Sequence, residues 1–439
     1  MKSRPNRFLS AALVLLALIA PLKAATYTWT SATTGGAWDT TSSNWSGAGS
    51  TWVNGNDATF GFTTGTTVTL SSAITTTGIT SNGTATLGIG AGSLIAPSFT
   101  FTNTGYIDLS STLGGTGGLS ISSSSTGRLN LKAAASYTGD TFLTGSAYLN
   151  LDGNPDNLLP TGTTVNMAAG TTVRLGKAAG NQQISGLVST TANAGTVTIT
   201  AAGYNLTLST KSGTTTTFSG TISGNSTNTL NLVINGSGTQ ALNGTNSFYG
   251  TTTVSSGTLS LGSNLTNTGS ISVSGGTLTS SIANVNLGTG GVSVSNGGTI
   301  DTRGSAIGSF TLAAGQDFMS NGGTLKFDLD TTSSLDQIKG SGAGSSFNLT
   351  NTSLTLNLIS WNVGDYNNSY SLFSGFIDSG SVSGVTITGY DTTNWVASLS
   401  NTGVLSFSAS AVPEPSTYAM LAGAAMLGFA ALRRRRTIV

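Results

Sequence analysis

Short stretches in which apolar residues alternate with Thr, Ser or Asn recur between residues 26 and 411. Residues 67–70, 197–199 and 354–358 are examples. This alternation places one face of a β-strand in a core and the other face in water. Gly, Asn or Ser turns bound the stretches, and no amphipathic helix is indicated among them. The pattern therefore predicts an all-β body.

A repeated unit is visible in the middle of this body. A strand pattern, a glycine turn and a Thr-Leu or Thr-Ile pair recur, with the threonine at Thr258, Thr277, Thr299 and Thr324, so that the spacings are 19, 22 and 25 residues. Periods of roughly 20 residues are typical of solenoids, in which stacked units share one core. Because the spacing is irregular, a β-sandwich with similar turns is the alternative.

Two segments resemble a known repeat. Residues 246–262 (NSFYGTTTVSSGTLSLG) combine an aromatic residue, a Thr-rich strand, a Gly-Thr-Leu turn and a second strand, and residues 137–151 are a looser copy. They resemble the autotransporter-associated β-strand repeat. The resemblance implies a right-handed parallel β-helix.

The amino-acid composition limits the kinds of catalytic and binding site that the chain can form. Charged residues make up only 7% of the 439 residues, and the chain contains neither Cys nor His. Disulfides, Ser-His-Asp catalysis and the usual zinc ligands are therefore excluded. Between Ala24 and Val412, eight Lys and Arg face fourteen Asp, which gives a net charge of −6. A nucleic-acid surface, which needs clustered Lys and Arg, is not expected.

The first 25 residues have the three parts of a secretory signal peptide. Lys2, Arg4 and Arg7 form a positive region, and an apolar run follows over residues 8–20. Small residues then allow cleavage after Ala24 or Ala25. The expected partners are the Sec translocon and signal peptidase. A permanent N-terminal anchor is the alternative.

The C-terminal end also has three parts. Val412, Pro413, Glu414 and Pro415 precede an apolar run over residues 419–432, and Arg433, Arg434, Arg435 and Arg436 follow it. As a helix the run would extend about 21 Å, less than the roughly 30 Å of a bilayer core. Flanking Tyr418 and the arginines could lengthen the span by interfacial anchoring. The arginines are expected to stay on the cytoplasmic side.

This end of the chain resembles the PEP-CTERM sorting signal, which has the same three parts in the same order. The resemblance implies recognition by an exosortase, cleavage near Pro413–Pro415, and a Gram-negative host that makes exopolysaccharide. It also implies an inner-membrane anchor in transit, followed by release to the cell surface or the medium. An ordinary tail anchor is the alternative, with Pro-Glu-Pro as a stiff spacer.

These patterns divide the chain. The expected parts are a signal peptide (1–25), an N-terminal β cap region (26–120), the solenoid repeats (121–310), a C-terminal β region (311–411) and the sorting signal (412–439). The cap region holds Trp29, Trp38, Trp45 and Trp52. Atypical end units protect the ends of solenoids, so these rings are interpreted as a capping cluster. A sugar-stacking platform is the alternative.

Residues suited to catalysis are few. Asp328 and Asp330 lie on one face of a predicted strand and could bind calcium with Asp336, although two solvated strand residues are the favoured interpretation. Arg174 with Lys177, or Asp301 with Arg303, are the only hints of a polysaccharide-cleaving site. No enzyme activity, cofactor or metal is therefore expected.

The sequence predicts a non-enzymatic structural protein of the cell surface or extracellular matrix, associated with exopolysaccharide or a biofilm. One alternative is a carbohydrate-binding adhesin, which would show an exposed aromatic row on one face. The other is a β-helix polysaccharide lyase or hydrolase, which would show Asp with Lys or Arg converging in a groove.

Overall fold

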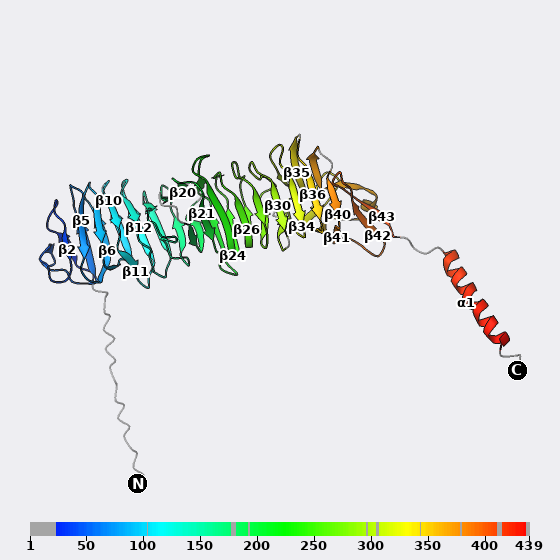
Figure 1. Cartoon of the computed structure of the whole chain (residues 1–439), viewed down its shortest axis with the longest axis horizontal. Coiled ribbons are helices and arrows are strands. Elements are labelled where there is room, and N and C mark those ends of the chain that lie inside the picture. The colour runs from blue at the N-terminus through cyan, green and yellow to red at the C-terminus, as the bar shows by residue number, and fades with distance from the viewer. Residues whose placement is uncertain are drawn as a thin grey trace, which may run out of the picture.

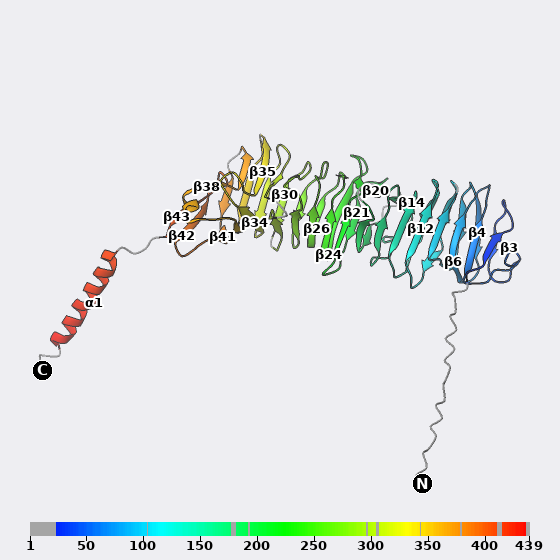
Figure 2. The same cartoon turned by 180° about the vertical axis from the view of Figure 1, so that it is seen from behind.

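The computed structural model describes residues 23–102, 104–176, 181–191, 194–295, 297–303, 307–342, 344–377, 380–410 and 415–435. The body is an elongated stack of short strands that cross its long axis, in chain order from one end to the other (Figure 1). The view from behind shows the same succession (Figure 2). Strands make up 49% of the chain, so the body is mostly β, which is consistent with the all-β prediction.

The strands of the described residues belong to five sheets. The first contains β1 (Thr26–Trp29), β3 (Trp45–Gly47), β4 (Asn56–Phe60), β6 (Ile74–Ser81), β8 (Ser93–Ile95), β9 (Ser98–Phe101), β11 (Thr112–Gly114), β12 (Leu119–Ser123), β14 (Thr141–Gly145), β16 (Thr164–Met167) and β19 (Gly186–Ser189). The second contains β2 (Gly36–Trp38), β5 (Thr66–Leu70), β7 (Leu87–Gly90), β10 (Tyr106–Leu109), β13 (Arg128–Leu131), β15 (Tyr148–Leu151), β17 (Thr172–Leu175), β20 (Thr196–Ile199), β23 (Thr221–Ser223) and β25 (Asn246–Ser247).

The third sheet continues the stack. It contains β18 (Gln182–Ile184), β21 (Tyr204–Leu208), β22 (Thr215–Phe218), β24 (Leu230–Leu242), β26 (Thr252–Leu261), β27 (Ile271–Val273), β28 (Thr277–Ser280), β30 (Val292–Ser295), β31 (Thr299–Asp301), β33 (Phe318–Asn321), β34 (Thr324–Leu329), β36 (Phe347–Thr350), β37 (Ser353–Leu358), β40 (Ser381–Ser383) and β41 (Thr386–Thr388). The fourth contains β29 (Asn284–Asn286), β32 (Ser309–Thr311), β35 (Gln337–Gly342) and β39 (Phe373–Phe376). The fifth contains β38 (Ser369–Ser371), β42 (Trp395–Leu399) and β43 (Val404–Ala409). A 3₁₀ helix, η1 (Val363–Asn367), and an α-helix, α1 (Pro415–Arg435), complete the described elements.

Parallel pairing in register builds the core. Ile107, Leu129, Leu149, Val173 and Val197 stand opposite one another on successive strands of the second sheet, and all five are buried. On each strand the residues next to these in sequence point outward, because successive side chains of a strand alternate between its faces. Each coil thus adds one apolar layer to a continuous core. This arrangement is consistent with a β-solenoid.

The structure places the four repeat threonines in one column. Thr258 pairs with Thr277, Thr277 with Thr299, and Thr299 with Thr324. The unequal spacings of the sequence are therefore taken up in the turns. Gly257 shows why a turn needs glycine: its φ is +64°, and a Cβ there would lie 2.5 Å from the carbonyl oxygen of Gly236. Among the described strands only β1–β3, β38–β43 and β42–β43 pair antiparallel, unlike the sheets of a β-sandwich.

Aromatic clusters lie at both ends of the stack. Trp45 packs against Trp52, Trp29 and Trp38 with ring centroids 5.0, 5.1 and 5.3 Å apart. All four indoles are buried beside β2 and β3, the terminal strands of their sheets. This arrangement is consistent with a capping cluster, and the buried rings are not accessible for stacking on a sugar. At the other end Tyr366 stacks on Trp395 with centroids 4.7 Å apart, beside the antiparallel fifth sheet.

The C-terminal helix α1 begins at Pro415, a residue favoured in the first turn of a helix because it lacks a backbone N–H. Side chains are described for residues 419–434, and all of them are exposed. Across the described residues, no helix has the length and apolar character required to traverse a membrane.

Replacing Trp45 with Ala is expected to destabilise the body strongly. The substitution removes a buried ring from the centre of the N-terminal cluster, and such truncations typically cost about 3–5 kcal/mol. Denaturant unfolding followed by circular dichroism measures the loss. Val53→Ala, at a side chain that is 53% exposed, is the matched control. Equal unfolding midpoints for the two variants would contradict the capping role.

Candidate functional sites

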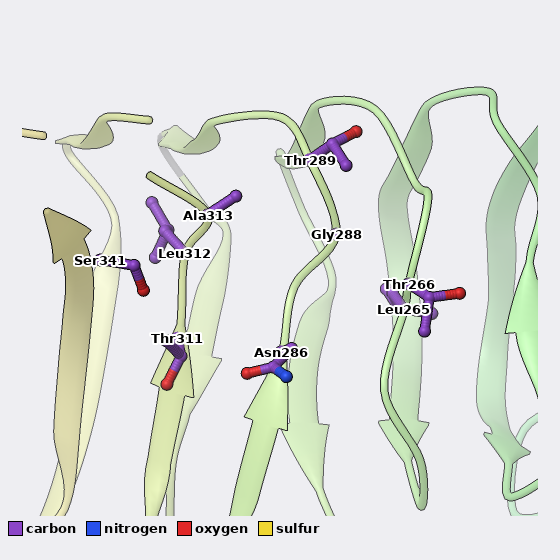
Figure 3. A pocket seen from close by; sticks show the side chains of 9 residues that line it. All are labelled: Leu265, Thr266, Asn286, Gly288, Thr289, Thr311, Leu312, Ala313 and Ser341. Carbon is purple, nitrogen blue, oxygen red and sulfur yellow. The ribbon is translucent and has the colours of Figure 1, made fainter. Parts of the chain in front are cut away.

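A shallow groove runs along the stack near β29, β32 and β35. Figure 3 shows its lining on neighbouring coils, which consists of Leu265, Thr266, Asn286, Gly288, Thr289, Thr311, Leu312, Ala313 and Ser341. Its volume is about 360 Å³. The lining offers hydroxyl and amide groups but no titratable side chain. It can hydrogen-bond a neutral ligand, but it supplies no acid or base for catalysis.

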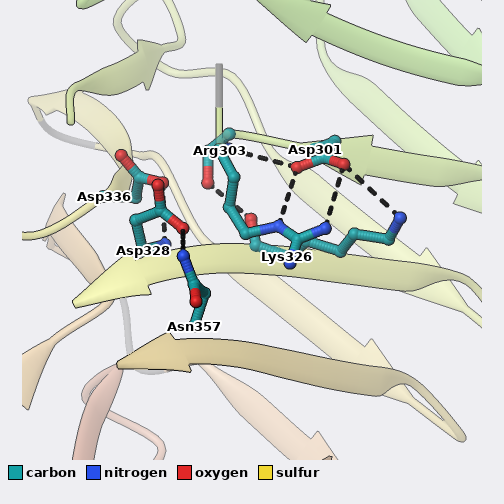
Figure 4. A network of polar contacts seen from close by, with 7 residues as sticks. Asp301, Arg303, Lys326, Asp328, Asp336 and Asn357 are labelled. Atoms are coloured by element: carbon teal, nitrogen blue, oxygen red, sulfur yellow. Dashed lines mark hydrogen bonds and ion pairs between the residues drawn. The ribbon is translucent and has the colours of Figure 1, made fainter. Parts of the chain in front are cut away.

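A small network of charged residues lies further along the chain. The Arg303 guanidinium donates to Asp301, with Nε 3.1 Å from Oδ1, and Lys326 Nζ lies 3.4 Å from Asp301 Oδ2 (Figure 4). Asn357 Nδ2 donates to Asp328 Oδ1 at 2.8 Å. Asp301 is thus paired with two cations, Arg303 two residues further along the same segment and Lys326 on the neighbouring strand β34.

Asp336 is the buried acid of this region. Its Oδ1 accepts from the backbone N–H of Gly308 at 2.9 Å, and its Oδ2 accepts from that of Asp328 at 2.8 Å. Burial raises the pKa of Asp336 to about 6, although these two backbone hydrogen bonds act in the opposite direction. The carboxyl therefore connects two chain segments and has a structural role.

The calcium interpretation has no geometric support. Within the described ranges, no three Asp, Glu, His or Cys side chains come together as a metal site, and this includes Asp328, Asp330 and Asp336. Both oxygens of Asp336 already accept backbone hydrogen bonds, and Asp328 accepts from Asn357. Of the two hinted cleavage pairs, Asp301 and Arg303 are in contact, but as an ion pair with Nε 3.1 Å from Oδ1. Arg174 lies apart from them, on β17 in the second sheet, whereas Asp301 ends β31 in the third. Lys177 lies outside the described residues.

The outer face of the second sheet carries a hydrogen-bonded ladder across four strands. Asn130 Nδ2 donates to Asp108 Oδ1 at 2.6 Å, and Asn150 Nδ2 donates to Asn130 Oδ1 at 3.0 Å. Arg174 Nε then donates to Asn150 Oδ1 at 2.8 Å. Lys132 Nζ lies 2.6 Å from Asp108 Oδ2, so the ladder runs from a neutralised acid to a guanidinium.

A second column lies beside this ladder on the same strands. The Arg128 guanidinium carbon lies 4.8 Å from the ring centroid of Tyr106 and 4.4 Å from that of Tyr148. All three side chains are partly exposed. Both contacts are within the range of a cation–π interaction. We call the two columns together the arginine–tyrosine strip, which consists of Tyr106, Asp108, Arg128, Asn130, Lys132, Tyr148, Asn150 and Arg174.

The sequence reasoning missed this strip. Its members are separated by 20 to 24 residues, for example Asp108, Asn130, Asn150 and Arg174, so no short motif joins them. The useful signal would have been polar and aromatic residues recurring at the solenoid period on outward positions. Two partly exposed tyrosines with an arginine between them lie on this face, and the exposed aromatic row expected of an adhesin stays a prediction.

The predicted processing residues lie at the edges of the described chain. Ala25 donates its backbone N–H to Asn56 Oδ1 at 2.8 Å, and its carbonyl oxygen accepts from the N–H of Asp57. The hydrogen bonds of the body therefore begin at the residue that follows the predicted cleavage site after Ala24. Val412, Pro413, Glu414 and Arg436 lie outside the described residues. Pro415, Arg433, Arg434 and Arg435 belong to α1. Cleavage at either site stays a prediction.

Comparison with known families identifies the end of the chain. Residues 411–436 match the family model described as the PEP-CTERM protein-sorting motif. This motif indicates exosortase-dependent export to the cell surface, with passage through the membrane before display. A search of curated proteins finds no match for the chain. The autotransporter-associated β-strand repeat is not shown, and that resemblance stays a prediction.

The buried carboxyl of Asp336 is expected to make the free energy of unfolding depend on pH. Because the pKa of Asp336 rises from 3.8 to about 6 on folding, its contribution to stability is full below about pH 3.8 and is lost as the pH rises through about 6. The loss is expected to be on the order of 2–3 kcal/mol. Asp336→Asn, which does not ionise, should lack this part of the pH dependence when the free energy of unfolding is measured from pH 4 to pH 7.

Asp330→Asn is the matched control, since it removes a neighbouring carboxyl that is only partly buried. It should retain the wild-type pH dependence. Identical pH profiles for wild type and Asp336→Asn would contradict the structural role of the buried acid.

Proposed function

We propose that this protein is an exported, non-enzymatic structural component of the surface or extracellular matrix of a Gram-negative bacterium, built on a right-handed parallel β-helix. The observation that carries the proposal is the combination of one long, mostly parallel strand stack with a C-terminal sorting motif. An elongated body with a continuous core suits a spacer or scaffold.

The surface chemistry of the body supports a passive role. Outward positions of the strands are mostly Thr, Ser and Asn, and only 7% of the chain is charged. Hydroxyl and amide groups hydrogen-bond hydrated polysaccharide without strong attraction to counter-ions. The Asp and Arg residues of the charged network are paired with one another rather than arranged around a groove. The lyase or hydrolase alternative therefore gains no support from the described residues.

The proposed route begins with the Sec translocon and signal peptidase at Ala24 or Ala25. The C-terminal segment then holds the protein at the inner membrane, with Arg433–Arg436 on the cytoplasmic side, until an exosortase cuts near Pro413, Glu414 and Pro415. The released body associates with exopolysaccharide at the surface or in the biofilm. Proline disfavours the helical conformation of the residue before it, which suits cleavage within the Pro-Glu-Pro motif.

A carbohydrate-binding adhesin is the second candidate function. The arginine–tyrosine strip favours it, because Tyr106 and Tyr148 are partly exposed on one face of the body. A structural role and an adhesive role are compatible, since a rod that binds matrix polymer also anchors itself in it.

Intact mass and C-terminal sequencing of the protein from envelope and medium test the proposed route. The expected product ends near Pro413–Pro415 and occurs outside the inner membrane. Glu414→Ala should reduce this processing and leave the terminal residues Thr437, Ile438 and Val439 in place. Asp391→Ala, at an exposed position in the body, is the control that should be processed normally. A wild-type chain recovered full-length and only in the inner membrane would overturn the proposal.

A further inference from the structure

The arginine–tyrosine strip has properties that a purely structural surface does not need. It lies on the outer face of β10, β13, β15 and β17, where most other coils carry Thr or Gly. Three of the eight basic residues between Ala24 and Val412 lie on it, although that part of the chain carries fourteen Asp. Basic side chains are therefore concentrated on one short stretch of an otherwise acidic body.

We propose that this strip binds an acidic polysaccharide that lies along the long axis of the body, with uronate carboxylates bound by Arg128 and Arg174. The inference rests on the proposed function, because the export route brings the strip into contact with surface polysaccharide. It adds a defined site and the chemical class of its ligand.

The charge pattern favours an acidic ligand. Asp108 is already engaged by Lys132 and Asn130. None of the ion pairs between described residues includes Arg128 or Arg174. Arg128 interacts with two aromatic rings, and Arg174 donates to a neutral amide. Both guanidinium groups therefore lack a carboxylate partner within the described chain, and a planar carboxylate matches their donor geometry.

The strip is also preorganised. Tyr106 and Tyr148 hold the Arg128 side chain between their rings, and Asn150 holds Arg174. Fixing long side chains before binding reduces the conformational entropy that a ligand has to offset. Asn150 is itself buried and hydrogen-bonded to Asn130, so the column cannot easily rearrange.

The geometry suits a linear polymer. Neighbouring strands of a sheet are about 4.8 Å apart, so Tyr106 and Tyr148, two strands apart, are separated by about 10 Å along the stack. A chain of sugar rings along this axis meets a tyrosine edge, a guanidinium and amide groups in succession. Tyrosine hydroxyls and asparagine amides are suitable partners for sugar hydroxyls. A nucleic acid would require many more phosphate contacts, and the net charge of −6 between Ala24 and Val412 opposes it.

Calorimetric titration of the full chain in mild detergent with oligogalacturonate tests the proposal. We expect saturable binding that weakens with added salt, and no comparable binding of neutral dextran. Arg128→Gln should weaken the affinity about tenfold, because it removes a charge-assisted contact. The double variant Tyr106→Ala, Tyr148→Ala should weaken it by a similar factor, because it releases the Arg128 side chain.

Matched controls lie outside the strip. Lys211→Gln removes one exposed positive charge elsewhere, and Tyr249→Ala removes a tyrosine that is 39% exposed; both should bind like wild type. Circular dichroism and the unfolding midpoint of each variant check the fold. If Arg128→Gln does not fold, Arg174→Gln at the end of the ladder tests the same site and should also weaken binding.

Three results would overturn the inference. These are no binding of oligogalacturonate, equal binding of poly-L-glutamate, or the same loss of affinity in Lys211→Gln as in Arg128→Gln. The last two would indicate a non-specific attraction of polyanions. Because binding is measured on purified protein, its failure leaves the C-terminal processing result unaffected, and a failure of export leaves the binding result intact.

Discussion

Stacking in register of parallel strands is the constraint on which the body depends. Each strand pairs with one about a coil away in sequence, so an apolar side chain must lie over the apolar side chain of the preceding coil. The column of Ile107, Leu129, Leu149, Val173 and Val197 satisfies this condition over five strands. A shift by one residue would move every side chain to the opposite face of the sheet. The turns therefore absorb most of the variation in the length of the repeat, and among the described strand pairs only β24–β26, β35–β39 and β4–β6 contain register shifts.

The same register determines what the outer surface can carry. Identical positions on neighbouring strands lie about 4.8 Å apart, at which distance like charges repel and hydrogen-bonding side chains form ladders. The outer surface of the body accordingly has few charged groups, which would repel one another, and many hydroxyl and amide groups, which can form ladders. Three ion pairs occur among the described residues: Lys132 with Asp108, and Arg303 and Lys326 with Asp301. Arg128 and Arg174 belong to none of these pairs, since Arg128 contacts aromatic rings and Arg174 donates to an amide.

The two ends of the stack must be covered, because an uncovered end would expose both the apolar core and the edges of the strands. At the N-terminal end β3 turns back antiparallel on β1, and the four tryptophans fill the last layer. At the other end the antiparallel fifth sheet and the stacked pair Tyr366 and Trp395 have the same effect. Large rings suit these positions because a single side chain covers much apolar surface.

The sequence by itself determined the features that depend on neighbouring residues. Local alternation predicted strands, the Gly-Thr-Leu repeat predicted stacked units, the tryptophan cluster predicted a cap, and residues 412–436 predicted the sorting motif. The tertiary structure alone decided which outward residues meet. Asp108, Asn130, Asn150 and Arg174 become neighbours only because the turns set each strand in register with the next. Likewise the burial of Asp336, which removes it from any metal site, depends on chain segments 8 and 28 residues away. Contacts across coils depend on the length and path of every intervening turn, and local sequence pattern does not contain that information.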